Sequence, residues 1–501
     1  MPKSQYVDPG KVFEPGYIKF HDIPVCQYNL SLDDEKRIYS KSDFIRIYRD
    51  MAVIREFETM LNDIKTKSVY NGVEYSNPGP AHLSIGQEAS AVGEAYCLDI
   101  NDYTFGSHRS HGEILAKGLS AIHKLSDNEL YTIMKEFLGG SILKVVEGTE
   151  EVRGNVKELA IDFLLYGALA EVFARTTGFN RGLGGSMHAF FIPFGIFPNN
   201  AIVGGSAGIA LGAALYKKSN AKKGIVVANC GDGAMGRGPV LEALNMSAMD
   251  QIRELWDRDG GMPILFNIFN NHYGMGGQTA GETMGWKMPA RIGAGVNPEQ
   301  MHAERVNGYD PLAVIDAFAR KKELLVRGEG PALLEVVTYR VSGHSPSDSS
   351  TYRTPEEIEA WKAADPIKAY REKLILGGIA SESELDAIHD TIVRRMTKIC
   401  KMAIDESISP RMDLDKNPDA IESIMFSNEK KPSLDNRPAE MLMPKDEVPR
   451  VKDIAGKIRT AFDADGKPVS KMKRYNICDG LFEPIIDKFY EDPTLIVYGE
   501  D

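Results

Sequence analysis

Two stretches of the sequence decide the fold: IVVANCGDGA at residues 225–234 and ILFNIFNNHYG at residues 264–274. Each begins with a run of apolar residues, the pattern of a strand buried on both faces of a parallel sheet. Residues 333–337 (LLEVV) form a third such run. Between the first two runs, apolar residues recur at the spacing of one helix face: Leu241, Leu244, Ala248, Ile252 and Leu255. Strand, glycine-rich turn, helix and strand predict a βαβ unit with its ligand site at the carboxyl ends of the strands.

Helical patterns surround this unit. Apolar residues repeat at helical spacing from residue 42 onward, and residues 355–405 have the charged, amphipathic pattern of a solvent-facing helical layer. The glycine-rich residues 202–215 favour a helix that packs closely on a partner. We therefore expect an α/β fold, with a mostly parallel sheet flanked by helices on both faces.

Changes in composition divide the chain into four segments. Residues 1–41 are rich in turn-forming residues and predict an N-terminal arm, and residues 42–404 contain the α/β domain. Residues 405–475 are rich in Pro, Asp, Lys and Ser with weak periodicity, which favours a linker. Residues 476–501 predict a helix followed by a strand at 495–498. A compact domain rarely ends directly after one strand, so we expect residues 476–501 to begin a further domain.

Composition excludes several classes of function. The 501 residues include 71 acidic and 59 basic ones, so the net charge is −12 and a phosphate backbone would be repelled. No apolar run is long enough to span a membrane, and the N-terminus lacks the apolar segment of a secretory signal. Five scattered cysteines without a CxxC pair favour neither a disulfide framework nor a zinc site. We expect a cytoplasmic protein that binds neither nucleic acid nor membranes.

The turn at residues 230–234 (CGDGA) has the chemistry of a metal and phosphate site. A Gly-Asp-Gly turn at a strand end leaves backbone N–H groups free for phosphate oxygens. Asp232 offers a hard carboxylate to Mg²⁺, and the Asn271 amide oxygen and the Tyr273 carbonyl add two further oxygen ligands. Such a turn by itself is more often a β-turn capped by an aspartate. Its pairing with two asparagines at the end of the next strand favours the metal site.

Histidines form the second group of candidates. They lie in segments rich in Gly and Ser: His82, His108, His111, His188 and His344. A single histidine beside glycine is more often a turn or capping residue, but several of them beside a diphosphate site favour a pocket that supplies protons near neutral pH. Arg109 suits a diphosphate oxygen, although a surface salt bridge is an equally common role for such a residue.

These motifs occur together in one known family. The motifs, in order, are HLSIGQEA at residues 82–89, HRSHG at 108–112, GGSMH at 184–188, IVG at 202–204, GDGA at 231–234, NNHYGM at 270–275 and the block from Tyr339 to Arg353. Over about residues 42–400 the chain resembles the α subunit of the thiamine-diphosphate-dependent first component of 2-oxo acid dehydrogenases, of the pyruvate and acetoin type. Chance does not produce so many motifs in order.

The resemblance implies a role for each candidate residue. Asp232, Asn271 and the Tyr273 carbonyl match the family's Mg²⁺ ligands. Contacts to thiamine diphosphate are implied for a second set: His108, Arg109, Ala201, Val203, Gly233, Ala234 and His344. Of these, Ala201 and Val203 occupy positions whose backbone meets the aminopyrimidine. As catalytic histidines, His344 matches the family's loop histidine at the diphosphate and the mouth of the active site, and His82 matches one near the thiazolium and substrate. His188 is a further candidate on the substrate side.

The resemblance also implies a reaction and partners. The cofactor adds to a 2-oxo acid, CO₂ is lost, and the acyl group passes to the lipoyl arm of a partner acyltransferase. Residues 492–501 resemble the opening strand of the family's β subunit, which implies the α part of an α–β fusion. The glutamate that activates the aminopyrimidine then belongs to the β-subunit-like module, in the same polypeptide or another chain. We expect a dimer or tetramer.

Some residues depart from the family pattern. His108 stands where pyruvate-type members have a tyrosine and is similar to acetoin-type members, which makes acetoin cleavage the first alternative. A transketolase-like transferase is the second alternative, and a non-catalytic assembly subunit is the third. The aromatic group Phe190, Phe191, Phe194 and Phe197 fits either a substrate pocket near His188 or, more commonly, core.

Overall fold

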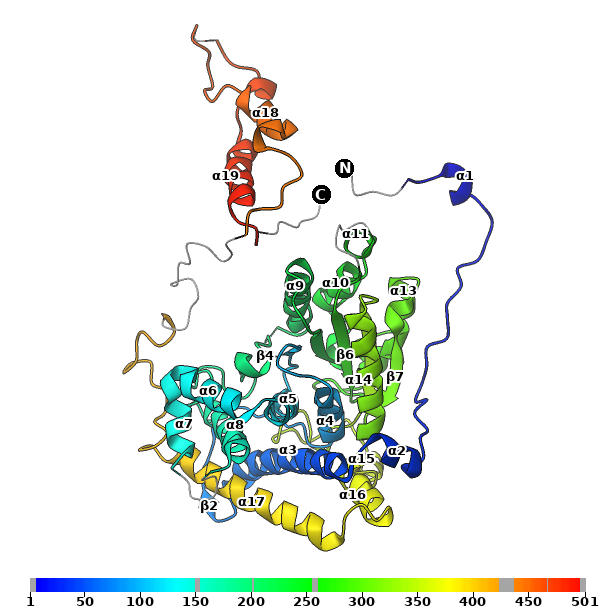
Figure 1. Ribbon diagram of the computed structural model, residues 1–501, viewed down its shortest axis with the longest axis vertical. Helices are drawn as coiled ribbons and strands as arrows, with labels where there is room; N and C mark the ends of the chain where they lie inside the picture. The colour runs from blue at the N-terminus through cyan, green and yellow to red at the C-terminus, as the bar shows by residue number, and fades with distance from the viewer. Residues whose placement is uncertain are drawn as a thin grey trace. The chain divides into compact units, whose positions relative to one another are not determined.

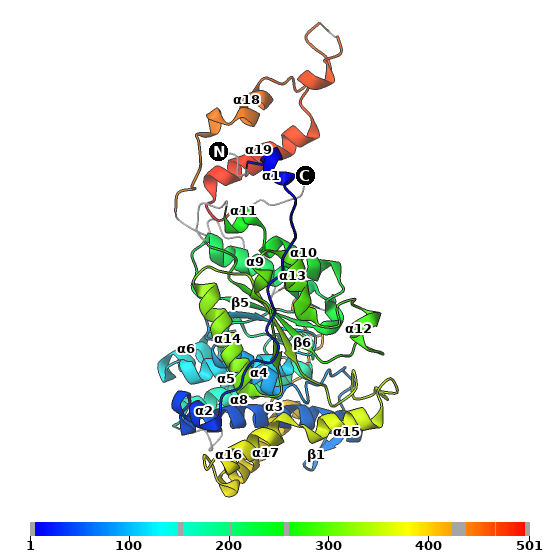
Figure 2. The same ribbon diagram turned by 90° about the vertical axis from the view of Figure 1, so that its right-hand side faces the viewer.

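The computed structural model describes residues 6–148, 154–200, 202–254, 260–422, 437–465 and 467–495. The chain separates into two compact units, Met1–Met412 and Asp413–Asp501. Figures 1 and 2 show the first unit as a sheet enclosed by helices. The division falls at residue 412, a few residues beyond the predicted end of the α/β domain, because residues 409–412 still bond to the first unit through Arg175 and its neighbours.

A six-stranded sheet with the order β4-β3-β5-β6-β8-β7 forms the centre of the first unit (Figure 1). Its strands, all parallel, are β3 Tyr103–Phe105, β4 Ile196–Phe197, β5 Val226–Gly231, β6 Ile264–Asn270, β7 Glu304–Asn307 and β8 Ala332–Val337. A separate antiparallel pair consists of β1 Val69–Tyr70 and β2 Val73–Glu74. The three strands predicted from apolar runs are confirmed as β5, β6 and β8, and the fold class is confirmed with them.

Alternate residues of the central strands face two different cores. Val226 and Phe266 join the core beneath α9 Gly205–Ser219 and α10 Gly238–Ser247, and Val227 and Leu265 join the core beneath α14 Pro311–Val326. Because both faces are covered, the central strands are mostly apolar, as a buried parallel sheet requires.

A further helical layer surrounds α3 Lys41–Lys67, which begins at a capping box on Ser40 (Figure 2). Its helices are α2 Leu32–Ile38, α4 Glu88–Tyr96, α5 His111–Lys124, α6 Asp127–Glu136, α7 Ser141–Val146, α8 Val156–Val172, α15 Pro355–Ala363, α16 Pro366–Leu376 and α17 Glu382–Ile404. The short helices α1 Pro9–Val12, α11 Asp250–Arg253, α12 Thr279–Glu282 and α13 Gly293–Val296 are not part of this layer. None of the helices in the described ranges is both long and apolar enough to cross a membrane.

One predicted helix is wrong in detail. The face from Leu241 to Ile252 is not one helix, because α10 ends at Ser247 and Met249 adopts an extended conformation before α11 begins. Leu244 is buried as expected, whereas Leu241 remains exposed, and Leu255 lies outside the described residues. Phe191 and Phe194 of the aromatic group belong to the core, since Phe191 is fully buried against Phe137 and Phe194 is fully buried against Phe191.

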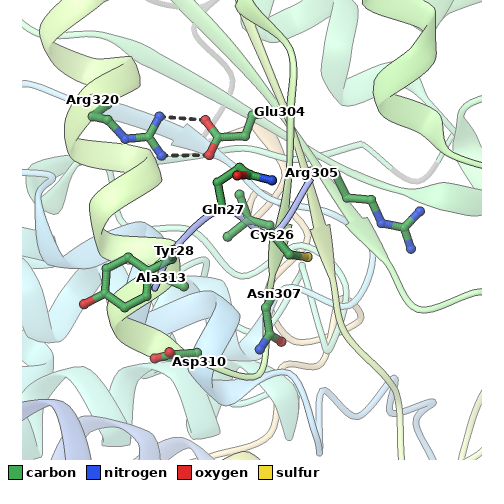
Figure 3. A pocket seen from close by; sticks show the side chains of 10 residues that line it. Cys26, Gln27, Tyr28, Glu304, Arg305, Asn307, Asp310, Ala313 and Arg320 are labelled. Carbon is green, nitrogen blue, oxygen red and sulfur yellow. Dashed lines mark hydrogen bonds and ion pairs between the residues drawn. The ribbon is translucent and has the colours of Figure 1, made fainter. Parts of the chain in front are cut away.

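The N-terminal segment covers the edge of the sheet. The Arg305 N–H donates to the Pro24 carbonyl (2.9 Å), and the Cys26 N–H donates to the Arg305 carbonyl (2.8 Å), so residues 24–26 lie parallel to β7. Figure 3 shows this segment beside β7, near the fork of two hydrogen bonds (2.7 Å each) from Arg320 to Glu304. The edge strand therefore has no free row of backbone groups in this part.

The second unit contains α18 Pro449–Ala455 and α19 Ile477–Glu491. Asp479 is buried and accepts hydrogen bonds from Arg450 (2.5 Å) and Lys457 (3.1 Å). The segment predicted as a linker thus contains a helix, because its charged residues pair with α19. Residues 496–501, including most of the predicted strand at 495–498, lie outside the described residues.

Close packing between α4 and α14 gives a testable consequence. A Cβ at Gly93 would lie 2.5 Å from the Val314 Cβ, whereas a Cβ at Gly212 on α9 would meet nothing within 4 Å. We expect Gly93→Ala to lower the free energy of unfolding by about 1–3 kcal/mol through overpacking. Gly212→Ala is the matched control and should be neutral or stabilising by up to about 1 kcal/mol. Denaturant unfolding followed by circular dichroism measures both, and equal effects would contradict the packing argument.

Candidate functional site

The glycine-rich turn after β5 forms a narrow cradle. Residues Asp232–Ala234 make one 3₁₀ turn directly at the strand's carboxyl end. A Cβ at Gly233 would lie 3.7 Å from both the Gly274 Cα and the Thr279 Cγ2, so the loop after β6 passes closely over the turn. The backbone N–H groups of this turn are those predicted to bind diphosphate, and a larger side chain at Gly233 would fill the space above them.

Asp232 is a buried acid with little compensation. Its side chain is 1% exposed, and its Oδ2 accepts a hydrogen bond from the Thr279 hydroxyl (2.5 Å). Burial raises the pKa of Asp232 to about 6, although hydrogen bonds from Thr279 and the Asn271 backbone oppose the shift. A divalent cation at this carboxylate would supply the missing positive charge.

Two further oxygens come from the loop after β6. Asn271 donates its Nδ2 to Gln87 (3.0 Å), which leaves Oδ1 as the acceptor end, used here by the Tyr273 N–H (3.2 Å). The Tyr273 hydroxyl is held by Glu357 (2.8 Å). Carboxylate, amide and carbonyl oxygens fit Mg²⁺, and no group of three or more His, Cys, Asp or Glu able to hold a metal occurs in the described part of the chain.

Three of the predicted histidines lie together. The ring centroids are 5.3 Å apart for His82 and His108, 5.0 Å for His82 and His344, and 5.7 Å for His108 and His344. Burial and the nearby Arg109 lower the pKa of His82 and of His344 to about 4, and that of buried His108 well below its usual range. The Nδ1 atoms of His82 and His344 are buried without a hydrogen-bond partner. All three rings are therefore neutral, with two ring nitrogens still to be satisfied.

Arg109 links the segments that carry these histidines. Its Nη1 donates to the Leu83 carbonyl (2.7 Å), its Nη2 donates to the His344 carbonyl (3.0 Å), and the side chain is buried. Burial and the like charge of Arg340 lower the pKa of Arg109 to about 9. A buried cation of this kind is typical of an anion-binding site, because a bound anion would offset the free-energy cost of burying the positive charge.

Arg340 is a cation that the sequence analysis did not single out. It donates to the carbonyls of Tyr273 (3.4 Å) and Gly274 (2.8 Å) and to the Tyr352 hydroxyl (2.6 Å). The Tyr352 hydroxyl in turn donates to Asp348 (2.6 Å), which also accepts from the His344 N–H (2.6 Å). The signal was present in the Tyr339–Arg353 block, where arginines and tyrosines alternate with small residues.

Other predicted residues lie apart from the histidine cluster. His188 hydrogen-bonds to Asn199 (3.2 Å), which holds the Ser107 carbonyl (2.8 Å) from the other side of the Arg109 loop. Val203 is exposed just before α9, and Ala201 lies outside the described residues. His111 is not at the pocket surface, because it is buried between Glu58 (3.0 Å) and Ser186 (2.9 Å).

Comparisons with known proteins identify the family of this chain. The sequence model described as "Dehydrogenase E1 component" matches residues 55–411. The chain belongs to the dehydrogenase E1 component family. It is 30% identical over 396 residues to "Probable pyruvate dehydrogenase E1 component subunit alpha, mitochondrial" of Caenorhabditis elegans, covering 78% of this chain and 82% of that protein. It is 30% identical over 370 residues to "Pyruvate dehydrogenase E1 component subunit alpha" of Rickettsia bellii, covering 73% and 91%.

Membership confirms the predicted family and enzyme class. The chain is a 2-oxo acid dehydrogenase component of the thiamine-diphosphate-dependent type, an oxidoreductase. Components of this family work with a β subunit and a lipoyl acyltransferase.

The buried Asp232 should cost the metal-free chain stability. Because its pKa in the folded chain lies above the ordinary value of 3.8, the folded state holds more protons between about pH 4 and 6, and stability falls as pH rises through that window. In the presence of a chelator, Asp232→Asn should raise the free energy of unfolding by about 1–3 kcal/mol at pH 7.5, with the gain vanishing near pH 4. Urea unfolding across this range measures it. Asp63→Asn, at a partly exposed position of α3 where Asp63 pairs with Lys67, is the control, and a pH-independent gain would refute the assignment to the Asp232 carboxyl.

The neutral histidines predict proton uptake on anion binding. A bound polyanion favours the charged imidazole and raises the lowered pKa values of His82 and His344 toward the ordinary range. Titration with Mg²⁺ and inorganic pyrophosphate at pH 6.0 should take up on the order of one proton per chain. Calorimetry in two buffers of different ionisation enthalpy measures this number. His344→Asn should reduce it and exposed His389→Asn should not; identical heats in both buffers would count against the prediction.

Proposed function

We propose that this chain binds thiamine diphosphate through Mg²⁺ and forms the α part of an enzyme that oxidatively decarboxylates pyruvate and passes the acyl group to the lipoyl group of its partner acyltransferase. One observation carries the proposal: three groups of residues lie together beyond the carboxyl ends of the central strands. They are the Asp232–Ala234 cradle, the Asn271–Tyr273 loop and the cluster of His82, His108 and His344. The curated relatives of similar length are named as pyruvate dehydrogenase α subunits.

The position of each group of residues supports a specific role in binding the cofactor or in the reaction. Asp232, Asn271 and the Tyr273 carbonyl hold the cation, and the N–H groups of Gly233 and Ala234 with Arg109 bind the diphosphate oxygens. Bound thiamine diphosphate supplies the nucleophilic carbon and the electron sink of the decarboxylation. His344 and His82 hold or move protons at their Nδ1 atoms, which have no hydrogen-bond partner in the described residues. His108 packs against both rings and excludes water.

Five further assignments belong to the proposal. His188 lies on the substrate side, and the backbone of Ala201 and Val203 meets the aminopyrimidine. Residues 476–501 begin a β-subunit-like module that completes the site. The assembly is a dimer or tetramer. The protein is cytoplasmic, a location that its similarity to the bacterial proteins of Rickettsia supports.

Acetoin cleavage is the second candidate. His108 favours it, since it stands where the resemblance implies a tyrosine in pyruvate-type members and its ring centroid lies 5.3 Å from that of His82 and 5.7 Å from that of His344. A transketolase-like transferase has less support, because the family that matches residues 55–411 is a dehydrogenase family. A non-catalytic subunit is disfavoured by the presence of Asp232 and Asn271.

The full-length native gene product should reduce an artificial electron acceptor in the presence of thiamine diphosphate, Mg²⁺ and pyruvate. Branched-chain 2-oxo acids and acetoin complete the substrate panel. Asp232→Ala should lower turnover by at least about 100-fold because the cation loses its carboxylate. Asp63→Ala is the matched surface control and should retain activity.

The outcomes separate the candidates. Turnover with acetoin alone moves the enzyme to the acetoin branch. No turnover with any substrate, despite calorimetric binding of the cofactor, contradicts both dehydrogenase proposals and leaves a transferase or a non-catalytic subunit.

A further inference from the structure

Two glutamates lie buried beneath the cofactor-binding loops. Glu113 on α5 and Glu94 on α4 are 4% and 2% exposed. Both carboxylates accept hydrogen bonds from Asn229 Nδ2, at 3.0 Å for Glu113 and 2.9 Å for Glu94. Glu94 also accepts from Asn267 Nδ2 (3.0 Å), which in addition donates to Asn229 Oδ1 (2.9 Å). A buried polar network of this kind persists only where its members satisfy one another.

Glu113 holds the loop that carries Arg109. Its Oε2 accepts from the Ser107 N–H (2.9 Å), and its Oε1 accepts from the Ser107 hydroxyl (2.5 Å). The same hydroxyl oxygen accepts from the Arg109 N–H (3.2 Å). A Cβ at Gly106 would lie 3.2 Å from the Glu113 Oε2, so the backbone passes directly over the carboxylate. The Glu113 carboxylate thus holds the loop through hydrogen bonds to both the backbone and the side chain of Ser107.

The network reaches the other two binding segments through the strands. Asn229 and Asn267 are opposite each other in the parallel register of β5 and β6. Asn229 lies three residues before Asp232, and Asn267 lies four residues before Asn271. One set of hydrogen bonds therefore ties together the Arg109 loop, the strand that leads into the Gly233 cradle and the strand that leads to the metal loop.

We propose that Glu113, supported by Glu94, is a positioning residue that sets the placement of the Arg109 loop relative to the metal and diphosphate cradle. The proposal rests on the proposed function, since it concerns the same cofactor site. Neither glutamate is among the residues predicted to bind the metal or the cofactor. They act through Ser107, Asn229 and Asn267.

The network also leaves one buried acceptor unused. The Asn267 Oδ1 is buried without a hydrogen-bond partner. Burial raises the pKa of Glu94 and of Glu113, and each carboxylate raises the cost of ionising its neighbour. The other titratable groups facing the pair are His111 and Lys117 on α5 and Cys230 on β5. The pair therefore shares a proton near neutral pH and gains a second negative charge beneath the diphosphate as pH rises.

The experiment measures the dissociation constant of thiamine diphosphate with Mg²⁺ by calorimetry. Glu113→Ala should weaken binding about 10–100-fold, the usual effect of removing a residue that orients a ligand-binding group. Glu113→Gln keeps an acceptor for the Ser107 N–H and should restore binding to within about threefold of wild type at pH 6.5. Glu56→Ala is the control, because Glu56 is a buried glutamate that accepts from the Tyr70 hydroxyl away from the site. It should lower stability and leave affinity unchanged.

A pH series distinguishes positioning from a merely structural role. Wild-type affinity should fall between pH 7 and 9 as the pair loses its shared proton, and Glu94→Gln should flatten this profile. An unchanged profile in Glu94→Gln would overturn the proposal, as would wild-type affinity in a folded Glu113→Ala. If Glu113→Ala does not fold, Ser107→Ala decides: it removes only the bridging hydroxyl and should weaken binding about threefold to tenfold, and no change overturns the proposal. Failure of the wild-type chain to bind the cofactor would instead refute the proposed function.

Discussion

The parallel register of β5 and β6 is the constraint on which the site depends. Because Gly231 lies opposite Phe269, the two strands end together, and the turn at Asp232 and the loop at Asn271 emerge side by side. Parallel pairing of buried strands requires apolar residues on both faces, and the helices α9, α10 and α14 supply the covering layers. This register therefore sets the distance between the Asp232–Ala234 cradle and the Asn271–Tyr273 loop, and it also places Asn229 opposite Asn267.

The uncompensated charges of the site follow from the same placement. An acid at a buried strand end, two buried arginines and three neutral histidines are costly without a ligand, and no arrangement of the core would select them for stability alone. The ligand they suit is an anion bound together with a divalent cation. These buried groups lower the stability of the ligand-free chain, and they lie at the carboxyl ends of the strands, where folds of this kind bind their ligands.

Much of this arrangement could be predicted from the sequence. The runs at residues 225–228, 264–269 and 333–337 are long and apolar, so periodicity alone located β5, β6 and β8. By contrast β3, β4 and β7 have two to four residues, too few for a periodic signal. The break between α10 and α11 was also missed, because the apolar spacing continues across it.

The candidate site, like the fold, could be predicted from the sequence only in part. The motifs grouped five histidines, and the structure places the rings of three of them together: His82, His108 and His344. The other two, His111 and His188, hydrogen-bond elsewhere. The roles of Arg340, Thr279 and Glu113 were not foreseen, since each depends on a contact with a segment far away in the chain. Local patterns reveal strands and motif residues, whereas supporting side chains become visible only when distant segments meet.

The segment at residues 24–26 has a consequence for where this domain begins. The family match starts at residue 55, yet the sheet's outer strand is sealed only by backbone that lies well before it. Ile23 also packs into the core beneath α9 and α10. A protein trimmed to the boundaries of the family pattern would therefore present an open strand edge, the feature through which sheets add foreign strands and aggregate. The cooperative unit of this enzyme is larger than its recognisable sequence motif.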